Sequence, residues 1–438
     1  CFSEEVSALD GFESISSSTV STKPSLEVCM NNPVAGGTSI RRDDALMVGR
    51  LEEQRLLRGA WERTSRCSEQ DQHGAPSEVV WLCGPSGVGK SYLLSSMRGF
   101  VCSQNNGIFV SSKFDQLSLR REPYYAIVAA LSDVCEVLAC AATDDDESSS
   151  TLVKQLIEAL NEDLPLFCRF VPTMTHLVDS DCLDLMEEPP LAESVSLGQL
   201  QRACKSFLSC VSRHRPLFLV LDDVQWSDED TVCLVRSFLE DPDSENICFV
   251  IATRDNDPAT TSVVSSLGLT SGTFDDVTSI GRDSSTEICL AMSEVNLVNL
   301  NEIEVERMVR GMVLDSDVKH EENNGELGTL AKVVLAKTQG SPLFVVQFME
   351  IMRSEGILIY SEEERRWDWD DKALRLDVSE DVCSSIDVRV KALNATTRSG
   401  LMVAAHLGFR FRMEVFEMVM LALYRKTYSG SDESSIRR

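Results

Sequence analysis

The chain has 438 residues, which is long enough for two or three domains with hydrophobic cores of their own. It carries 70 acidic and 41 basic residues, which gives a formal net charge of −29. That balance counts against nucleic-acid binding by the chain as a whole, because such affinity comes from Lys and Arg side chains that neutralise phosphates. No apolar run of the sequence approaches the roughly 18–20 residues of a membrane span, so we expect no membrane segment.

In chain order, residues 1–43 are rich in Ser and Thr and poor in aromatic residues, and they predict a disordered tail. From residue 45 to 61 apolar residues recur at helical intervals, which predicts a short helix after Val48-Gly49-Arg50. The acidic run 143–150 predicts a solvated loop, and 179–196 predicts an irregular segment. Strands are expected at 79–82, 108–110, 217–221 and 247–252, and helices at 92–97, 124–141, 152–160, 197–212 and 231–239.

Strands that alternate with helices indicate βαβ units and a parallel sheet, so the expected fold class is α/β with its domain over residues 44–285. Parallel strands linked by right-handed crossovers place a ligand at their carboxyl ends. After residue 285 the pattern becomes helical, with helices expected at 286–295, 302–313 and 327–356, where Pro342 opens a new helix. Residues 357–370 alternate around a polar turn and predict a β-hairpin, and 385–425 predict a small helical module.

The fifteen cysteines are scattered singly, with no C-x-x-C pair, and the chain has only five histidines. Zinc sites and disulfide frameworks need organised spacings, which the sequence lacks. Cysteines inside apolar runs, such as Cys83 and Cys248, behave as small hydrophobic residues. We therefore expect a reducing, cytoplasmic location. The chain starts at Cys1 rather than methionine, which predicts a fragment or a processed protein.

The most specific motif is an uninterrupted G-x-x-x-x-G-K-S that follows an apolar strand and precedes a helix-forming stretch. Its glycines let backbone N–H groups surround phosphates, the helix N-terminus adds a positive dipole end, Lys90 neutralises charge, and Ser91 Oγ ligates magnesium. The alternative, a Gly/Ser-rich turn that contains a lysine by chance, does not require the flanking strand and helix. The predicted phosphate-binding residues are Gly84, Pro85, Ser86, Gly87, Val88, Gly89, Lys90 and Ser91.

A second motif is the buried strand 217–221, which ends in Asp222 and Asp223. We expect Asp222 to hold magnesium opposite Ser91, and Asp223 to orient or deprotonate the attacking water. An apolar run that ends in acids is common by chance, so this motif gains its weight from the phosphate loop. Arg254 follows the strand 248–252 and would reach the γ-phosphate; the alternative is an ordinary surface arginine.

These motifs resemble the STAND class of AAA-related signal-transduction ATPases. The resemblance rests on Gly84–Ser91, LDDVQWSDED (221–230), IATRDND (251–257) and TQGSPLFVVQF (338–348), in that order. SSKFDQ (111–116) followed by Pro123-Tyr124 is similar to the origin-recognition-like AAA module of large regulators that carry fused kinase or cyclase domains. The similarity runs from about residue 45 to 425.

The resemblance implies further roles. Val48 and Arg50 belong to a short box that lies against adenine and ribose, and Pro342 belongs to a G-x-P motif that packs on the base from a helical lid, residues 286–356. The hairpin and AAHLGFRF (404–411) resemble the passage into a winged-helix module, so 357–438 is expected to hold a partial one. Leu51 departs from the family, which usually has an acidic residue there, and no sensor arginine is evident in the lid.

The resemblance also implies the function: a slowly hydrolysing ATPase, with ATP and Mg²⁺ as ligands, that acts as a conformational switch in signal transduction. Expected partners are ATP or ADP, protein partners or fused signalling domains, and further copies of the chain in a nucleotide-dependent manner; neither membrane nor nucleic acid is expected. The expectation of ATP rather than GTP rests on the resemblance. The sequence contains no guanine-reading N-K-x-D motif. The alternatives are a DNA-binding, initiator-like ATPase and a nucleotide-locked protein scaffold.

Overall fold

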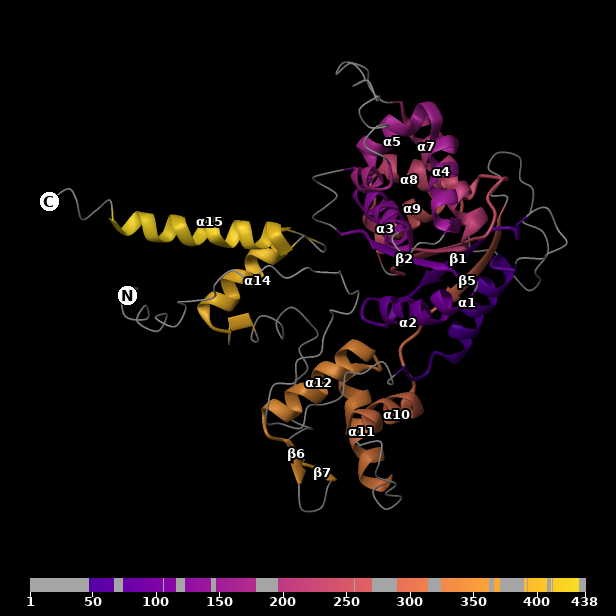
Figure 1. Cartoon of the computed structure of the whole chain (residues 1–438). Helices are drawn as coiled ribbons and strands as arrows, with labels where there is room; N and C mark the ends of the chain where they lie inside the picture. Colours follow the sequence, from indigo (N-terminus) through magenta and orange to yellow (C-terminus); the bar gives the residue numbers. More distant parts are fainter. Residues whose placement is uncertain are drawn as a thin grey trace. The chain divides into compact units, whose positions relative to one another are not determined.

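Figure 1 shows the computed structural model of the chain. It describes residues 47–66, 74–104, 106–115, 123–142, 147–178, 196–255, 257–269, 290–313, 324–361, 366–370, 390–391, 393–407, 411 and 413–432. All of these lie in one compact unit, Ile40–Arg438. The expected tail 1–43 and all but the last residue of the expected irregular segment 179–196 lie outside the described residues.

A five-stranded parallel sheet forms the centre of the fold, in the order β2-β3-β4-β1-β5. Three of the strands are buried along their whole length, as expected for a parallel sheet covered on both faces. The predicted α/β class and its parallel sheet are thereby confirmed. The strands are β1 (Glu78–Cys83), β2 (Ile108–Lys113), β3 (Leu217–Asp222), β4 (Ile247–Thr253) and β5 (Ala291–Asn296).

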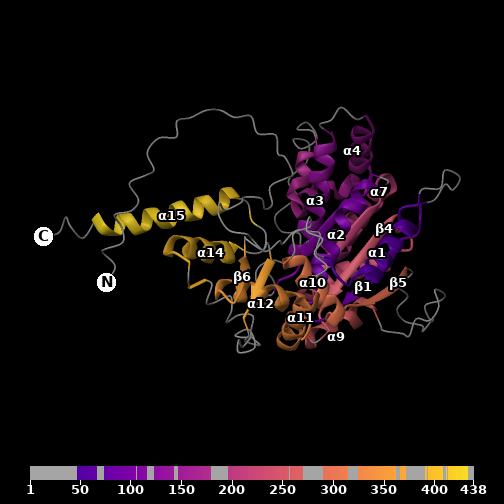
Figure 2. The same cartoon turned by 90° about the horizontal axis from the view of Figure 1, so that it is seen from below.

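Two separate hydrophobic clusters cover the two faces of this sheet, because alternate strand residues point to opposite sides. In β1, Val79 and Trp81 belong to one cluster, whereas Val80 and Leu82 belong to the other. Figures 1 and 2 show the corresponding layers of helices. One face carries α1 (Leu51–Thr64) and α2 (Lys90–Ser103), and the other carries α3 (Tyr125–Ala142), α4 (Glu147–Leu160), α5 (Leu164–Phe170), α7 (Leu197–His214), α8 (Glu229–Leu239) and α9 (Pro258–Leu267).

Local sequence signals place several of these helices. Ser196 and Gln199 form a capping box at the start of α7, and Asp228 caps α8 through the Thr231 amide. Asp257 caps α9, which ends at Gly268 in the left-handed conformation. The sequence prediction did not include α5 or α9, and the acidic run expected as a loop up to residue 150 already enters α4 at its Glu147.

The helix expected at 286–295 is wrong, because Ala291–Asn296 forms the strand β5 and pairs with β1 in parallel. Ala, Met and Glu favour a helix locally, but hydrogen bonding to a buried neighbouring strand overrides that preference. As an edge strand, β5 buries only Val295 among its six residues, so its sequence lacks the apolar run of a central strand. The sheet therefore extends beyond the domain boundary expected at residue 285.

The helical segment that follows has a hydrophobic cluster of its own, with Met308, Val309 and Phe348 among its buried members. It consists of α10 (Glu302–Val313), α11 (Asn324–Thr338) and α12 (Pro342–Ser354), so Pro342 opens a helix as predicted. The predicted hairpin is also present, with β6 (Leu358–Ser361) antiparallel to β7 (Arg366–Trp369). We call α10–α12 the lid.

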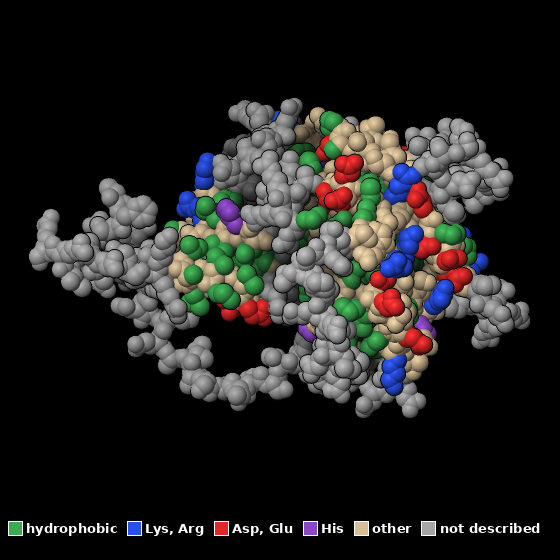
Figure 3. All heavy atoms as spheres, turned by 90° about the horizontal axis from the view of Figure 1, so that it is seen from above, with side chains coloured by type: hydrophobic (Ala, Val, Ile, Leu, Met, Phe, Trp, Pro, Cys, Tyr) green, Lys and Arg blue, Asp and Glu red, His purple; other side chains and the backbone are tan. Residues whose placement is uncertain are grey.

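Two further helices, α14 (Ala395–Leu407) and α15 (Met413–Asp432), contact each other. None of the side chains of α14 is buried, and Met402 and Met418 are 58% and 66% exposed. Figure 3 shows hydrophobic side chains gathered on this pair. Whether the pair belongs to a winged-helix module stays a prediction. Among the described residues, no helix combines the length and apolar character that a membrane crossing demands.

Candidate functional site

The motif Gly84–Ser91 forms the turn between β1 and α2, at the carboxyl end of a central strand. Gly87 and Gly89 have φ of 77° and 100°, in the left-handed region that favours glycine. A β-carbon on Gly84 would lie 2.6 Å from the carbonyl oxygen of Leu297. Because α2 begins at Lys90, a helix N-terminus closes the turn, which is the geometry of a phosphate-binding loop.

Lys90 is buried in this loop. Its Nζ donates to the carbonyl oxygens of Gly84, at 2.5 Å, and Pro85, at 3.0 Å. Burial lowers the pKa of Lys90, while the nearby charges of Asp223 and Asp222 oppose that shift. A buried ammonium group held by two carbonyl oxygens can transfer its hydrogen bonds to phosphate oxygens, to which it is also attracted by charge.

The two halves of the predicted site meet directly. Ser91 Oγ donates to Asp222 Oδ2 at 2.6 Å, although the residues are 131 positions apart in the chain. The other oxygen of this carboxylate, Asp222 Oδ1, is buried and has no hydrogen-bond partner within the described residues. A serine hydroxyl beside an unsatisfied carboxylate oxygen fits a hard, oxygen-preferring cation such as Mg²⁺.

No cluster of three or more His, Cys, Asp or Glu side chains suited to a metal occurs in the described part of the chain. A magnesium site does not require such a cluster, because the protein often supplies only one or two of its oxygen ligands. Mg²⁺ bound in this way takes its remaining ligands from water and from the phosphates of the substrate.

Asp223 is 3% exposed and has a left-handed backbone, with φ of 59°. It accepts hydrogen bonds from Arg254 Nε at 3.0 Å, Arg254 Nη2 at 3.2 Å and Gln225 Nε2 at 2.8 Å. Lys113 Nζ lies 3.0 Å from Asp223 Oδ2. Burial alone would raise the pKa of Asp223, but the bonds from Arg254 and Gln225 and the charge of Lys113 outweigh it and lower the pKa to about 2.

The strand order of the sheet explains why Arg254 lies beside the phosphate loop and the two carboxylates. It follows β4, and β4 lies between β1, which leads into the phosphate loop, and β3, which ends at Asp222. Its guanidinium group binds Asp223 through two nitrogens, and this hydrogen bonding raises the pKa of Arg254 further above its ordinary value. The arginine is therefore within the site, paired with the second acid rather than free at the surface.

Lys113 is a site residue that the sequence analysis did not single out. It is the last residue of β2 and pairs in register with Asp222 on the adjacent strand β3. Its Nζ lies 3.0 Å from Asp223 and 3.7 Å from Asp222. The available signal was a cation at the carboxyl end of a predicted strand, which became informative only once β2 was known to be the neighbour of β3.

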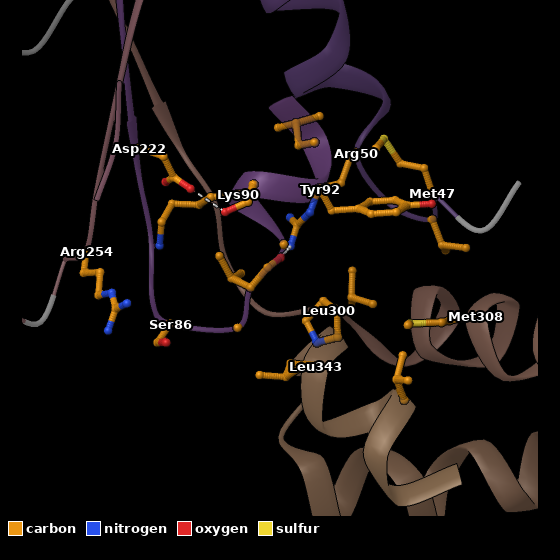
Figure 4. A pocket seen from close by; sticks show the side chains of 18 of the residues that line it. Met47, Arg50, Ser86, Lys90, Tyr92, Asp222, Arg254, Leu300, Met308 and Leu343 are labelled. Atoms are coloured by element: carbon orange, nitrogen blue, oxygen red, sulfur yellow. Dashed lines mark hydrogen bonds between the residues drawn. The ribbon is translucent and has the colours of Figure 1, made fainter. Parts of the chain in front are cut away.

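A cavity of about 390 Å³ joins these groups to the lid. In Figure 4, Lys90, Asp222 and Arg254 lie on one side of it, and Met47, Leu300 and Met308 lie on the other. We call these the polar end and the apolar end. The lid contributes no charged side chain to the cavity wall within the described residues. Its lining side chains are Met308, Met312, Pro342, Leu343 and Val346, and Leu300 lines the cavity just before α10.

Of the residues expected to contact the nucleoside, Val48, Arg50 and Pro342 all line this cavity. The guanidinium group of Arg50 is held by main-chain carbonyl oxygens, those of Val88 at 3.1 Å and Val298 at 2.6 Å. Arg50 therefore ties the phosphate loop to the segment that leads into the lid. Tyr92, on the first turn of α2, also lines the cavity and was not predicted.

Comparison with known proteins agrees with this geometry. Residues 47–250 match the AAA ATPase domain family, and this stretch runs from the box before α1 into β4. Those residues form an AAA ATPase-like nucleotide-binding module. Hybrid signal transduction histidine kinase G of Dictyostelium discoideum is 29% identical over 170 residues, which are 37% of this chain and 4% of that protein. The match thus spans only a small fraction of the kinase.

Solved structures with similar folds include Cdc6p of Pyrobaculum aerophilum, 13% identical, with 84% of this chain and 76% of that chain covered and a TM-score of 0.38. The ORC2 protein of Aeropyrum pernix, in complexes with ADPNP and ADP, is 13% identical over 85% and 79% of the two chains, with a TM-score of 0.39. Drosophila ORC bound to DNA is 13% identical over 87% and 82%, with a TM-score of 0.36. Because these TM-scores are low, the evidence for the site is its own geometry and not the similarity to these structures.

Proposed function

We propose that the cavity binds ATP with Mg²⁺ and that the chain is a slowly hydrolysing, nucleotide-dependent switch in signal transduction. One observation carries the proposal: a single cavity has a phosphate loop with two carboxylates at its polar end and a wall of aliphatic and thioether side chains at its apolar end. A nucleoside triphosphate has the matching chemistry, with a charged chain at one end and a flat, weakly polar base at the other.

At the polar end, the backbone N–H groups within Gly84–Ser91, to which Pro85 contributes none, and the ammonium group of Lys90 would hold the β- and γ-phosphates. Ser91 Oγ and Asp222 would hold Mg²⁺, which supplies charge neutralisation to the phosphates when bound. Lys90 would exchange its bonds to the Gly84 and Pro85 carbonyl oxygens for bonds to phosphate oxygens. Residues 86–91 and Asp222 already line the cavity, so binding needs little rearrangement of the strands that carry them.

Asp223 and Arg254 would control hydrolysis. With a pKa of about 2 and with both carboxylate oxygens hydrogen-bonded, Asp223 is a weak base and is not free to orient water. A γ-phosphate would compete with Asp223 for the guanidinium group of Arg254. Asp223 would orient the attacking water only in the fraction of molecules in which Arg254 has moved to the phosphate, which accounts for slow turnover.

The switch would use the lid. Val48, Arg50 and Pro342 would frame the nucleoside, so a bound nucleotide touches both the sheet domain and the lid. A γ-phosphate that changes the contacts of the core would then favour one arrangement of lid and core, and its loss would favour another. The similarity to a signal transduction histidine kinase of Dictyostelium supports a signalling context. Fused signalling domains, self-association, the domain division and the partial winged-helix module remain part of this proposal.

The test is equilibrium binding of Mg-ATP together with steady-state phosphate release, on the wild type, Lys90→Ala and Asp223→Asn. We expect the wild type to bind and to hydrolyse slowly, Lys90→Ala to lose binding, and Asp223→Asn to keep binding but lose turnover. A nucleotide-locked scaffold would bind without phosphate release in any variant. Equal, undiminished hydrolysis by both variants would defeat the assignment.

A further inference from the structure

Gln225 is a buried side chain that bridges the two groups expected to control hydrolysis. It is 3% exposed and lies in the short turn Val224–Trp226 that follows Asp223. Its Nε2 donates to Asp223 Oδ1 at 2.8 Å, and its Oε1 accepts from the main-chain N–H of Arg254 at 3.3 Å. One amide group therefore joins the residue after β3 to the residue after β4.

The surroundings of this amide fix its orientation. If the amide were reversed, its oxygen would face the carboxylate of Asp223 and its NH₂ group would face the N–H of Arg254, so both contacts would be repulsive. The left-handed backbone of Asp223 starts the turn that brings the Gln225 side chain back to this carboxylate. Gln225 is not among the described residues that line the cavity, so its effect on a bound ligand passes through these two neighbours.

The main chain of Arg254 is held at both of its polar atoms. Gln225 binds its N–H, and the hydroxyl group of Thr260, on α9, donates to its carbonyl oxygen at 2.6 Å. The side chain of Arg254, in contrast, is 34% exposed. A change of partner by the guanidinium group is therefore a movement of the side chain about a fixed main chain.

We infer that Gln225 is a positioning residue for hydrolysis, which holds the Asp223 carboxylate and the Arg254 main chain in register while the Arg254 side chain moves to the γ-phosphate. This role rests on the proposed function, in which that movement lets Asp223 orient water. Asp223 Oδ1 accepts from both Arg254 Nε and Gln225 Nε2, so departure of the guanidinium group opens one acceptor site there and leaves the Gln225 bond in place. Without that bond, the carboxylate would rotate toward Lys113, which lies beside Oδ2.

Gln225→Met should lower turnover and leave binding almost intact. Methionine keeps the length of the side chain but makes neither hydrogen bond, so we expect kcat for phosphate release to fall by about tenfold. The KM for Mg-ATP and the affinity for ADP should change by less than about threefold, because the phosphate loop is untouched. In the Asp223→Asn background the same change should cost less than about twofold, since the carboxylate that Gln225 positions is then gone.

Two further variants separate this role from a general loss of structure. Gln225→Asn keeps a polar amide but is one methylene too short to span both partners, so kcat should again fall, and this variant decides if Gln225→Met does not fold. Asn246→Asp is the matched control. Asn246 is 4% exposed and directly precedes β4, and its amide accepts from Ala75 N–H at 2.8 Å and donates to the Ser212 carbonyl oxygen at 3.2 Å, outside the described cavity wall. Its replacement should lower the stability of the fold but not kcat.

The experiment is phosphate release as a function of Mg-ATP concentration, isothermal titration with ADP and urea unfolding, all on the full chain. A fall in kcat at nearly constant KM in both Gln225 variants, absent in Asn246→Asp and suppressed in the Asp223→Asn background, supports the role. If kcat is unchanged or rises in the Gln225 variants, or falls equally in Asn246→Asp, Gln225 is not a positioning residue, although the proposed function stands while the wild type hydrolyses ATP. A wild type that releases no phosphate contradicts both.

Discussion

The two ends of the cavity differ in how they are built. At the polar end, Lys90 begins α2, and the other charged side chains end or follow a strand of the parallel sheet: Lys113 ends β2, Asp222 ends β3 and is followed by Asp223, and Arg254 follows β4. At the apolar end, the wall consists of side chains such as Met308 and Val346, which also face the hydrophobic interior of the lid. Charge at a strand end marks a site in the sequence, whereas an apolar side chain in a helix does not.

Loss of Lys90 should have the largest effect and would test the polar end alone. Lys90→Ala removes the only side-chain cation of the loop Gly84–Ser91, so we expect affinity for Mg-ATP to fall by about a hundredfold or more. Because burial lowers the pKa of Lys90, its removal should not destabilise the fold. Isothermal titration measures the affinity for Mg-ATP, and chemical denaturation measures the stability of the fold. Retained affinity would mean that the polar end is not where phosphates bind.

Asp223→Asn should separate binding from turnover. The amide cannot carry the negative charge that attracts Arg254 or accept a proton, so we expect phosphate release to fall by about a hundredfold at unchanged Mg-ATP affinity. A phosphate-release assay at saturating Mg-ATP measures the effect, with Asp228→Asn at the α8 cap as a control outside the cavity. Phosphate release by Asp223→Asn at the wild-type rate would show that Asp223 takes no part in hydrolysis.

The stability of the fold should depend on pH through Asp223, at the polar end of the cavity. The pKa of Asp223 is lowered from 3.8 to about 2 in the fold, so its ionised form stabilises the folded state above pH 3.8, and this contribution disappears as the pH falls toward 2. The shift corresponds to about 2 kcal/mol. Urea unfolding at about pH 5 and about pH 3 should show the wild type lose part of its advantage over Asp223→Asn. A constant difference would contradict the depressed pKa.

Arg254 should affect the choice between nucleotides rather than binding in general. If its guanidinium group moves from Asp223 to a γ-phosphate, Arg254→Ala should weaken ATPγS binding by about tenfold and leave ADP binding nearly unchanged. Arg236→Ala is the control, because it breaks an ion pair between α8 and its C-cap residue Glu240, both outside the cavity. Equal losses for both nucleotides would place Arg254 away from the γ-phosphate.

The apolar end should give the smallest and least selective effect. Val346→Ala removes two methyl groups from the lid wall, so we expect affinity for ATPγS and ADP to fall by the same factor, about threefold to tenfold. Isothermal titration with ATPγS and with ADP measures the two affinities. If the affinity for ATPγS fell and the affinity for ADP did not, the two ends of the cavity would not bind separate parts of one ligand.

Much of the fold and the polar end was predictable from sequence. The buried strand that ends in Asp222, and the phosphate loop before α2, have motifs in which residue type and position are both required by the chemistry. The error at β5 arose because an edge strand with one buried residue has no apolar run, and its pairing with β1 is a property of the whole sheet. Tertiary pairing decided the structure there, against local preference.

The rest of the site needed coordinates for the same physical reason. Lys113 belongs to the site because β2 is the neighbour of β3, and strand order is not written in either segment. The Arg50 contacts to Val88 and Val298 join positions as far as 248 residues apart, and the side chain alone does not say which carbonyl oxygens it will meet. The sequence does not reveal that Ser341 Oγ, at the N-cap of α12, is buried without a hydrogen-bond partner within the described residues, because burial depends on the packing of the lid.

The central claim is that one ligand spans both ends of the cavity, and photolabelling with Mg-8-azido-ATP tests it most directly. The azide lies on the base, so we expect crosslinks in lid peptides from 302–313 and 342–354, and we expect Lys90→Ala to abolish them although the lysine lies at the opposite end. Crosslinks that fall outside the lid and the residues around Val48, or that persist undiminished in Lys90→Ala, would contradict the account.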